Sequence, residues 1–223
     1  VAHFTTLARY NAWATARLLD AVAVVPEADY RRDVGLFFRS IHGTLNHLLV
    51  GEHQLWFVRF SEGSSPRVAL DAEAEPDRAA LDARLRAGAA RWEPLVKSVA
   101  PARWEGSLDY TTMRGTAASL PFAATLTHVF NHGTHHRGQV TAALTALAAH
   151  FLLALELKRA LLLGTVLAST DAAAVFFLIR AGGLRLERRT GSTLELESGA
   201  NEPVAVFLTI TLTGWLAGKE ARY

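Results

Sequence analysis

Apolar residues recur every three or four positions over several long stretches of the chain, and this period predicts amphipathic helices. Each stretch is bounded by a proline or by a loop rich in helix-breaking residues. The four stretches are 2–24, 36–61, 77–99 and 121–149. Because amphipathic helices bury their apolar faces against other elements, the pattern predicts a mainly α fold.

The segment 104–120, between the third and fourth stretches, has a different pattern. Its aromatic and apolar residues precede Met113-Arg114-Gly115, and threonines lie on both sides of that turn. This arrangement predicts a short hairpin or another extended excursion. Four long helices with one extended crossover predict an up-down four-helix bundle, whose ligand sites lie in the core between facing helices.

The pattern changes again after residue 150. Residues 151–168 favour helix, whereas apolar and polar residues alternate around Thr190-Gly191-Ser192 and again in 204–212. This alternation predicts strands, so we expect an additional C-terminal α+β segment. The predicted domains are therefore a helical bundle at 1–149 and an extension at 150–223. The extension could be a fused module, a dimerisation element or an atypical chain end.

Charge and apolar content exclude some partners. Lys and Arg number 23 against 21 Asp and Glu, and the basic residues are dispersed rather than gathered in a stripe, so we expect no nucleic-acid partner. The longest apolar tracts, 160–169 and 172–179, are each shorter than the ~20 residues that span a bilayer. We therefore expect no membrane segment.

The chain contains no cysteine. This excludes disulfides, a thiolate nucleophile and every zinc site that uses a cysteine ligand. Such a composition is compatible with the reducing cytoplasm, where we expect the protein to act.

Four of the nine histidines lie within nine positions, at 128, 132, 135 and 136. Histidine is the commonest metal ligand, and residues four apart share one face of a helix. His132 and His136 could therefore bind one ion from a single helix. His135 is displaced by about one hundred degrees from His136, so we expect it to face another direction.

A third ligand should come from a facing helix, and the second predicted helix offers several candidates. His47 lies in the middle of that helix among core residues, so its position favours it, with His42 and Glu52 as weaker candidates. The alternative is that these histidines are hydrogen-bonded core residues without a metal. A His-x-x-x-His pair facing a third inward histidine favours the metal site. The motif His-Glu-x-x-His of metalloproteases is absent, since Gly133 follows His132.

Three motifs resemble those of the DinB/YfiT-like metalloenzyme family. The histidine cluster Asn131–Gln139 looks like the family signature, Tyr10–Ala14 is similar to its N-terminal motif, and Ser40–Leu49, followed by Trp56, resembles its second-helix motif. The resemblance extends from about residue 3 to 148, in the same order and spacing. Residues 150–223 depart from it, because relatives usually finish soon after the fourth helix.

The resemblance implies a four-helix bundle that binds a divalent ion, usually nickel or zinc, through three histidines. Carried over to this sequence, the metal ligands are His47, His132 and His136. Some relatives are thiol-dependent S-transferases or isomerases, and bundles of this family often pair, so a homodimer is expected. His128, Asn11 and Gln139 are candidates for the pocket or for hydrogen bonds around the site; a purely structural role is the alternative for each.

The three tryptophans Trp13, Trp56 and Trp92 fit the core better than a substrate-stacking surface. Three neutral histidines leave coordination positions open, as in catalytic rather than structural sites. We therefore expect a metal-dependent enzyme that acts on a small molecule, by thiol transfer with a low-molecular-weight thiol or by hydrolysis. The alternative is a non-catalytic metal-binding or stress-related interaction protein.

Overall fold

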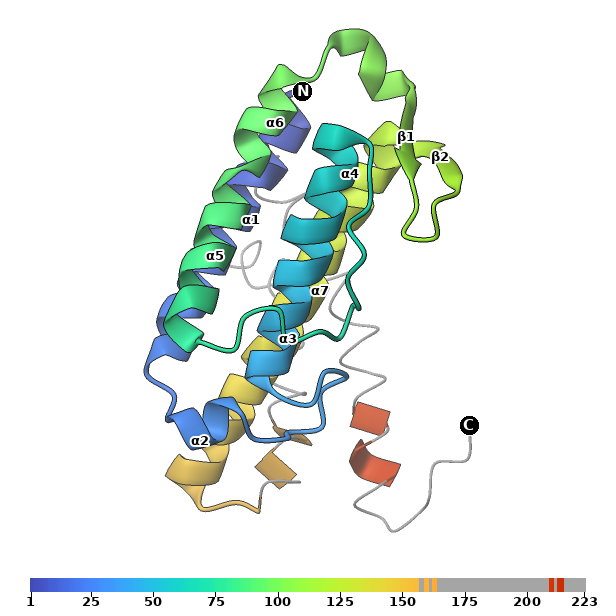
Figure 1. Cartoon of the computed structure of the whole chain (residues 1–223). Helices are drawn as coiled ribbons and strands as arrows, with labels where there is room; N and C mark the ends of the chain where they lie inside the picture. The colour runs from blue at the N-terminus through green and yellow to red at the C-terminus, as the bar shows by residue number, and fades with distance from the viewer. Residues whose placement is uncertain (157–158, 161, 164–208, 211, 215–223) are drawn as a thin grey trace, which may run out of the picture. The chain divides into compact units, whose positions relative to one another are not determined.

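The structure is a computed structural model that describes residues 1–156, 159–160, 162–163, 209–210 and 212–214 (Figure 1). Helix predominates among these residues, which confirms the prediction of a mainly α protein. The chain divides into two units, Val1–Arg137 and Gly138–Tyr223, and the contacts described below lie within the first. The strands predicted around residue 191 lie outside the described residues, as does most of the strand predicted at 204–212. That second prediction is wrong at residues 209, 210 and 212, which are helical.

The first two helices are α1 (Ala2–Ala23) and α2 (Glu27–Tyr30). Helix α1 ends three residues before Pro26, close to its predicted end. Its buried face packs along the helices α5 (Arg78–Ala90) and α6 (Trp92–Ser98). The apolar face of α1 is therefore buried against neighbouring helices, as its helical spacing of apolar residues predicted.

A second helical run consists of α3 (Ile41–Leu48), the π-helical segment η1 (Leu49–Trp56) and α4 (Phe57–Glu62). The predicted start at residue 36 is wrong, because Arg39 has a φ of 66° and breaks the helical backbone. Ser40 then caps α3, its side chain accepting a hydrogen bond from the backbone N–H of Gly43 at 3.0 Å.

The predicted helix 77–99 is interrupted at Arg91, which separates α5 from α6. Asp77 caps α5, since its side chain accepts from the N–H of Ala80 at 2.8 Å. The physical reason for the interruption is Pro94, which has no N–H to donate and whose ring clashes with the carbonyl four residues earlier. A 3₁₀ turn, η2 (Pro101–Glu105), follows.

The segment predicted as a hairpin or excursion is an antiparallel hairpin of β1 (Ser107–Thr111) and β2 (Ala117–Pro121) (Figure 1). Gly115 has a φ of 80° in the turn, a conformation that suits glycine. The N–H of Thr111 donates to the carbonyl of Gly63 at 2.9 Å, so the hairpin is fastened to the end of α4.

Helix α7 (Phe122–Leu153) carries the histidine cluster. It covers the fourth predicted stretch and ends four residues later than predicted. The helix predicted over 151–168 is wrong at 154–156, which are not helical, and Ala154 has a φ of 50°.

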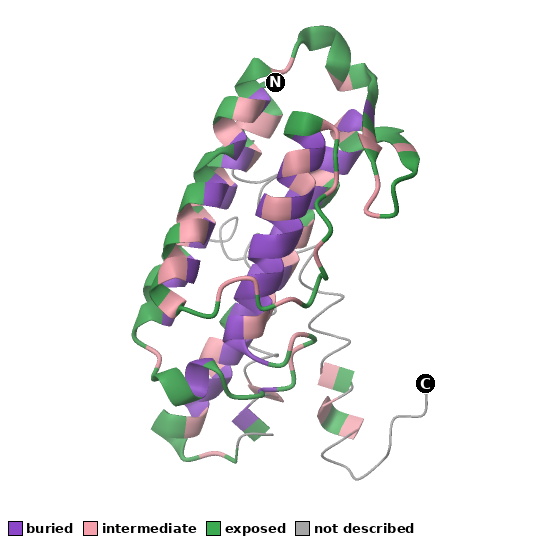
Figure 2. Cartoon of the chain, viewed as in Figure 1, coloured by how far each residue is buried: buried purple, intermediate pink, exposed green. Residues whose placement is uncertain are grey.

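An aromatic core fills the end of the first unit that carries the hairpin. Figure 2 shows the buried faces of the long helices turned toward one another. Trp92 is fully buried, and its ring makes edge contacts with Phe57, Phe60 and Phe130 at centroid distances of 5.1–5.8 Å. This geometry is favourable for aromatic rings. The core fixes α4, α6 and α7 against one another and so sets the spacing of the helices that carry the histidines.

Candidate metal centre

Three histidines from two helices meet in the first unit. The Nε2 atom of His132 on α7 lies 3.1 Å from Nε2 of His47 on α3 and 3.1 Å from Nε2 of His136. One ring nitrogen from each of the three lies within 4.8 Å of the others. His47 and His136 are buried, and His132 is partly buried. These are the three residues that the sequence predicted as ligands.

The spacing of these nitrogens fits a common ion. Ligands at the ~2.0–2.1 Å Zn–N distance in a tetrahedral arrangement lie about 3.3 Å from each other, close to the two separations observed. The Nδ1 atom of His47 lies 2.8 Å from the carbonyl oxygen of Leu70. A carbonyl only accepts, so Nδ1 carries the proton and the lone pair of Nε2 faces the other two rings. A cation is the natural partner for lone pairs that converge in this way.

Burial favours the neutral imidazoles of His47 and His132, and metal ligands must be neutral. Desolvation lowers the pKa of His47, although the bond to Leu70 opposes the shift. Desolvation also lowers the pKa of His132 to about 4, and the neighbouring His47, His128 and His135 add to that shift. His47 and His132 therefore keep a lone pair available at neutral pH.

Phe38 lies over one side of the site. Its ring stacks on His47 at a centroid distance of 3.9 Å and lies 5.7 Å from the ring of His136. The loop that carries Phe38 can approach α3 because Gly43 has no side chain; a Cβ there would overlap the carbonyl oxygen of Phe38. On η1, a Cβ added to Gly51 would lie 3.5 Å from Cε1 of His132, which is ordinary packing distance.

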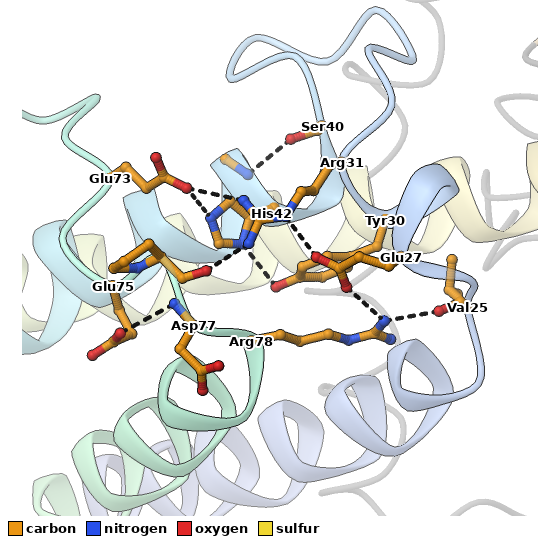
Figure 3. Close-up of polar contacts among 12 residues, drawn as sticks. Val25, Glu27, Tyr30, Arg31, Ser40, His42, Glu73, Glu75, Asp77 and Arg78 are labelled. Atoms are coloured by element: carbon orange, nitrogen blue, oxygen red, sulfur yellow. Dashed lines mark hydrogen bonds and ion pairs between the residues drawn. The ribbon is translucent and has the colours of Figure 1, made fainter.

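The two weaker ligand candidates do not join this cluster. Nδ1 of His42 lies 3.2 Å from the hydroxyl of Tyr30, and Nε2 lies 2.6 Å from a carboxylate oxygen of Glu73 (Figure 3). Burial raises the pKa of Tyr30 to about 12, so its hydroxyl remains protonated and can donate to His42. His42 therefore has a partner on each ring nitrogen, and it connects α3 with Tyr30 on α2 and with the loop at Glu73.

Glu52 belongs to a buried polar group with Asn11 and Arg137. Asn11 donates from Nδ2 to Glu52 and accepts from Nη1 of Arg137. All three side chains are almost completely buried. Gly133 makes room for this group, because a Cβ there would lie 2.8 Å from Oε2 of Glu52. Asn11, a candidate for hydrogen bonds around the site, thus connects α1, η1 and α7.

The remaining predicted residues lie around the cluster or apart from it. His128 is exposed, and its ring centroid lies 6.1 Å from that of His132. His135 lies against His136 at 4.9 Å but is not part of the three-histidine group, and burial lowers its pKa. Gln139 is partly buried on α7, just beyond the first unit.

Among the three tryptophans, the core prediction holds for Trp92 and fails for Trp13, which is 61% exposed. Trp56 is partly buried and packs against the aromatic core.

Sequence reasoning missed the Leu70 carbonyl, the ring of Phe38 and the role of Asn11 in connecting Glu52 with Arg137. A backbone carbonyl leaves no residue-specific signal, because every residue carries one. Arg137 does stand beside His136 in the predicted signature, and a buried arginine needs an acceptor. That requirement could have connected Arg137 with Asn11, the acceptor that it has in the structure.

Comparison with known proteins agrees with this geometry. The model of the DinB family matches residues 2–148, well over half of the chain. The chain belongs to the DinB family. In this DinB-family chain the three-histidine group lies inside the matched region, as the sequence resemblance implied. No solved structure matches the chain.

The C-terminal part is similar to a different group of proteins. A family model described as sodium/hydrogen exchanger, transmembrane, matches residues 122–222. The chain is 55% identical over 78 residues to the K(+)/H(+) antiporter NhaP of Alkalimonas amylolytica, covering 35% of this chain and 14% of the antiporter. It is 48% identical over 82 residues to NhaP2 of Shewanella sp. (strain ANA-3), covering 37% and 14%.

The chain thus spans about a seventh of the length of the antiporters it matches. Among the residues that the structure describes, none of the helices is long and apolar enough to cross a membrane.

Proposed function

We propose that this DinB-family chain binds a divalent metal ion, nickel or zinc, through His47, His132 and His136. The observation that carries the proposal is the convergence of three Nε2 atoms, two pairs of them 3.1 Å apart. The hydrogen bond from His47 to the Leu70 carbonyl supports it, because metal-ligating histidines usually donate their second N–H to such an acceptor.

The proposed activity is metal-dependent chemistry on a small molecule. A bound divalent ion supplies Lewis acidity toward a coordinated water or thiol. Three neutral protein ligands leave positions for such a molecule, and the chain has no cysteine, so a low-molecular-weight thiol would come as a cosubstrate. Thiol S-transfer is our first candidate, and hydrolysis is the second. The role of the protein is to hold three neutral donors and to exclude water on the Phe38 side.

The competing function is non-catalytic metal binding in a stress-related interaction protein. The two differ in whether the metal-loaded protein consumes a substrate. A screen of several thiols against several electrophiles, and of hydrolysable esters without thiol, tests this difference. We expect a turnover that disappears in the histidine variants. Activity that persists in those variants would come from another source.

Metal content tests the site itself. Alanine variants of His47, His132 and His136 are purified beside the natural chain, loaded with nickel or zinc and analysed for elemental composition. We expect about one ion per chain in the natural protein and a large loss in each variant. His128→Ala serves as the matched control from the same helix, with metal content unchanged. Full occupancy in all three variants would refute the ligand assignment.

We further propose the arrangement around this site: a four-helix bundle of DinB type over 1–149, a separate C-terminal part at 150–223, a homodimer, and a cytoplasmic location for the histidine centre. Analytical ultracentrifugation of the full chain at several concentrations tests the dimer. A single species of about 24 kDa at all concentrations would contradict it.

A second proposal concerns the C-terminal part, and the identity to the antiporters carries it. We propose that this part associates with a membrane, as a segment of transporter origin. The sequence-based expectation of no membrane segment predicts the opposite. Carbonate extraction of cells expressing the full chain separates the two: retention in the membrane pellet supports association, and complete release into the supernatant contradicts it. The proposal concerns association and not ion transport.

A further inference from the structure

The loop between α4 and α5 lacks a hydrophobic anchor. None of the residues from 64 to 77 is buried, and the side chain of Leu70 is 45% exposed. Nevertheless the carbonyl of this same Leu70 must lie within 2.8 Å of Nδ1 of His47. Without apolar burial, the position of the loop depends on polar contacts.

Arg31, Arg59 and Arg84 hold parts of the loop by hydrogen bonds to Pro76, Ser65 and Ala74. The contacts made by fully buried side chains come from α3, the helix that carries His47. The amide of Asn46 makes two hydrogen bonds to one residue of the loop: its Oδ1 accepts from the N–H of Glu75 at 2.9 Å, and its Nδ2 donates to the carbonyl of Glu75 at 3.1 Å. Asn46 is 2% exposed and Glu75 is half-buried, so the Asn46 end of both bonds is largely shielded from water. Losing one partner of a buried hydrogen bond leaves the other unsatisfied, which is costly.

His42, one turn earlier on α3, makes the next contact. Its Nε2 lies 2.6 Å from Glu73, and Tyr30 fixes the other side of the ring (Figure 3). Arg31 also donates to Glu73, at 3.0 Å. A cavity of about 240 Å³ borders this contact and is lined in part by Arg31, His42, Asn46 and Glu73. The side chain of Glu73 is 54% exposed, so water reaches the Glu73 contact more easily than the contact made by the buried Asn46.

We propose that Asn46 and His42 are positioning residues for the metal site, acting through the loop on His47. They hold the loop where the Leu70 carbonyl accepts the Nδ1 proton of His47, and this bond keeps the Nε2 lone pair directed at His132 and His136. The inference rests on the proposed metal site for its functional meaning, whereas its structural part concerns the tautomer of His47 and needs no metal.

The tautomer of His47 in metal-free protein is the first measurement. Long-range ¹H–¹⁵N spectra of the full chain at neutral pH distinguish a ring protonated at Nδ1 from one protonated at Nε2. We expect Nδ1–H in the natural protein and a mixture of tautomers in Asn46→Ala. Asn46→Asp keeps an acceptor for the Glu75 N–H and should retain more of the Nδ1–H form.

Zinc affinity, measured by competition with a chromophoric chelator, is the second readout. Asn46→Ala should bind zinc about 10–100-fold more weakly, the range typical for loss of an outer partner of a metal-ligating histidine. His42→Phe keeps a ring beside Tyr30 but loses the contact with Glu73, and should show a smaller loss. Thr44→Val is the matched control on α3, because the Thr44 hydroxyl bonds only to the carbonyl of Ser40 within the described contacts.

An Nδ1–H tautomer and natural zinc affinity in both Asn46→Ala and His42→Phe would overturn the inference. An equal loss in Thr44→Val would also overturn it, since the effect would then reflect general weakening of α3. If the natural protein binds no zinc or nickel, the proposed function fails, and the tautomer measurement still decides whether Asn46 and His42 position His47.

Discussion

The two sides of the histidine centre are built differently. On α7, His132 and His136 are placed by the helix itself, since residues four apart lie on one face. On α3, His47 is oriented by a loop carbonyl and covered by a stacked ring. Nδ1 of His132 is buried with no hydrogen-bond partner in the described part of the chain, in contrast to Nδ1 of His47. The α7 side therefore depends on helix geometry, and the α3 side depends on tertiary contacts.

This difference predicts that substitutions outside the three histidines disturb the α3 side of the centre more than the α7 side. Gly43→Ala should have the largest effect, because the new Cβ would overlap the backbone carbonyl of Phe38. We expect a loss of about 3 kcal/mol in the free energy of unfolding, at the upper end for overpacking. Urea unfolding measures it, with Gly51→Ala as a matched control that has room for a Cβ. Equal stability of the two variants would contradict the prediction.

His132 on the α7 side should contribute to the pH dependence of the metal-free protein, beside the buried His47 and His53, whose pKa values desolvation also lowers. The pKa of His132 in the folded state is about 4, below its value of about 6.5 in the unfolded chain. Between these values the unfolded chain binds more protons, so stability falls as the pH decreases through this window. Through this window His132 lowers the free energy of unfolding by up to about 3 kcal/mol between pH 7 and pH 4.

Urea unfolding of metal-free protein at several pH values tests this effect. His132→Gln should reduce the slope of stability against pH, whereas His3→Gln, at an exposed position, should leave it as in the natural chain. A slope that is the same in the natural chain and in His132→Gln would show that other groups cause the pH dependence.

A larger side chain beside the buried group of Asn11, Glu52 and Arg137 should have an intermediate effect on stability. In Gly133→Ala the Cβ would lie 2.8 Å from Oε2 of Glu52 and 3.0 Å from Nη1 of Arg137. These atoms are the ends of side chains, but burial and hydrogen bonds restrict their movement. We expect a loss of about 2 kcal/mol in the free energy of unfolding, despite the better helix propensity of alanine. A gain in stability would mean that Glu52 and Arg137 move freely.

The smallest effect should come from the ring over His47. Phe38→Leu keeps an apolar side chain but loses the stacked ring, so we expect a loss of about 1 kcal/mol in the free energy of unfolding. The ring protons of His47 should also lose the upfield shift that a stacked phenyl ring causes in proton NMR spectra. Phe37→Leu is the control, because Phe37 is 82% exposed. Unchanged His47 shifts in Phe38→Leu would contradict the stacking.

The same contrast explains what the sequence could predict. The spacing of His132 and His136 is a local property, and the preference for His47 over His42 followed from its central place among apolar residues; the structure groups His47 with the α7 pair. The carbonyl of Leu70 could not be predicted, because it depends on a loop that is fixed by contacts between distant residues. The π-helical pitch of η1 was not predicted either, since the apolar spacing of 36–61 indicated an ordinary helix. The break at Arg91 was predictable, since Pro94 is visible in the sequence.

The π-helical segment η1 also affects how this protein could tolerate changes in length. A π-turn accommodates an additional residue within a helix, so η1 can be regarded as a helix that holds inserted sequence without shifting its two ends. Deleting one residue within Leu49–Trp56 could return part of the segment to α pitch and leave α3 and α4 in their present register. Helix α3 has no π-turn that could absorb a deletion of the same size. Such a deletion before His47 would rotate its side chain away from His132 by about 100°.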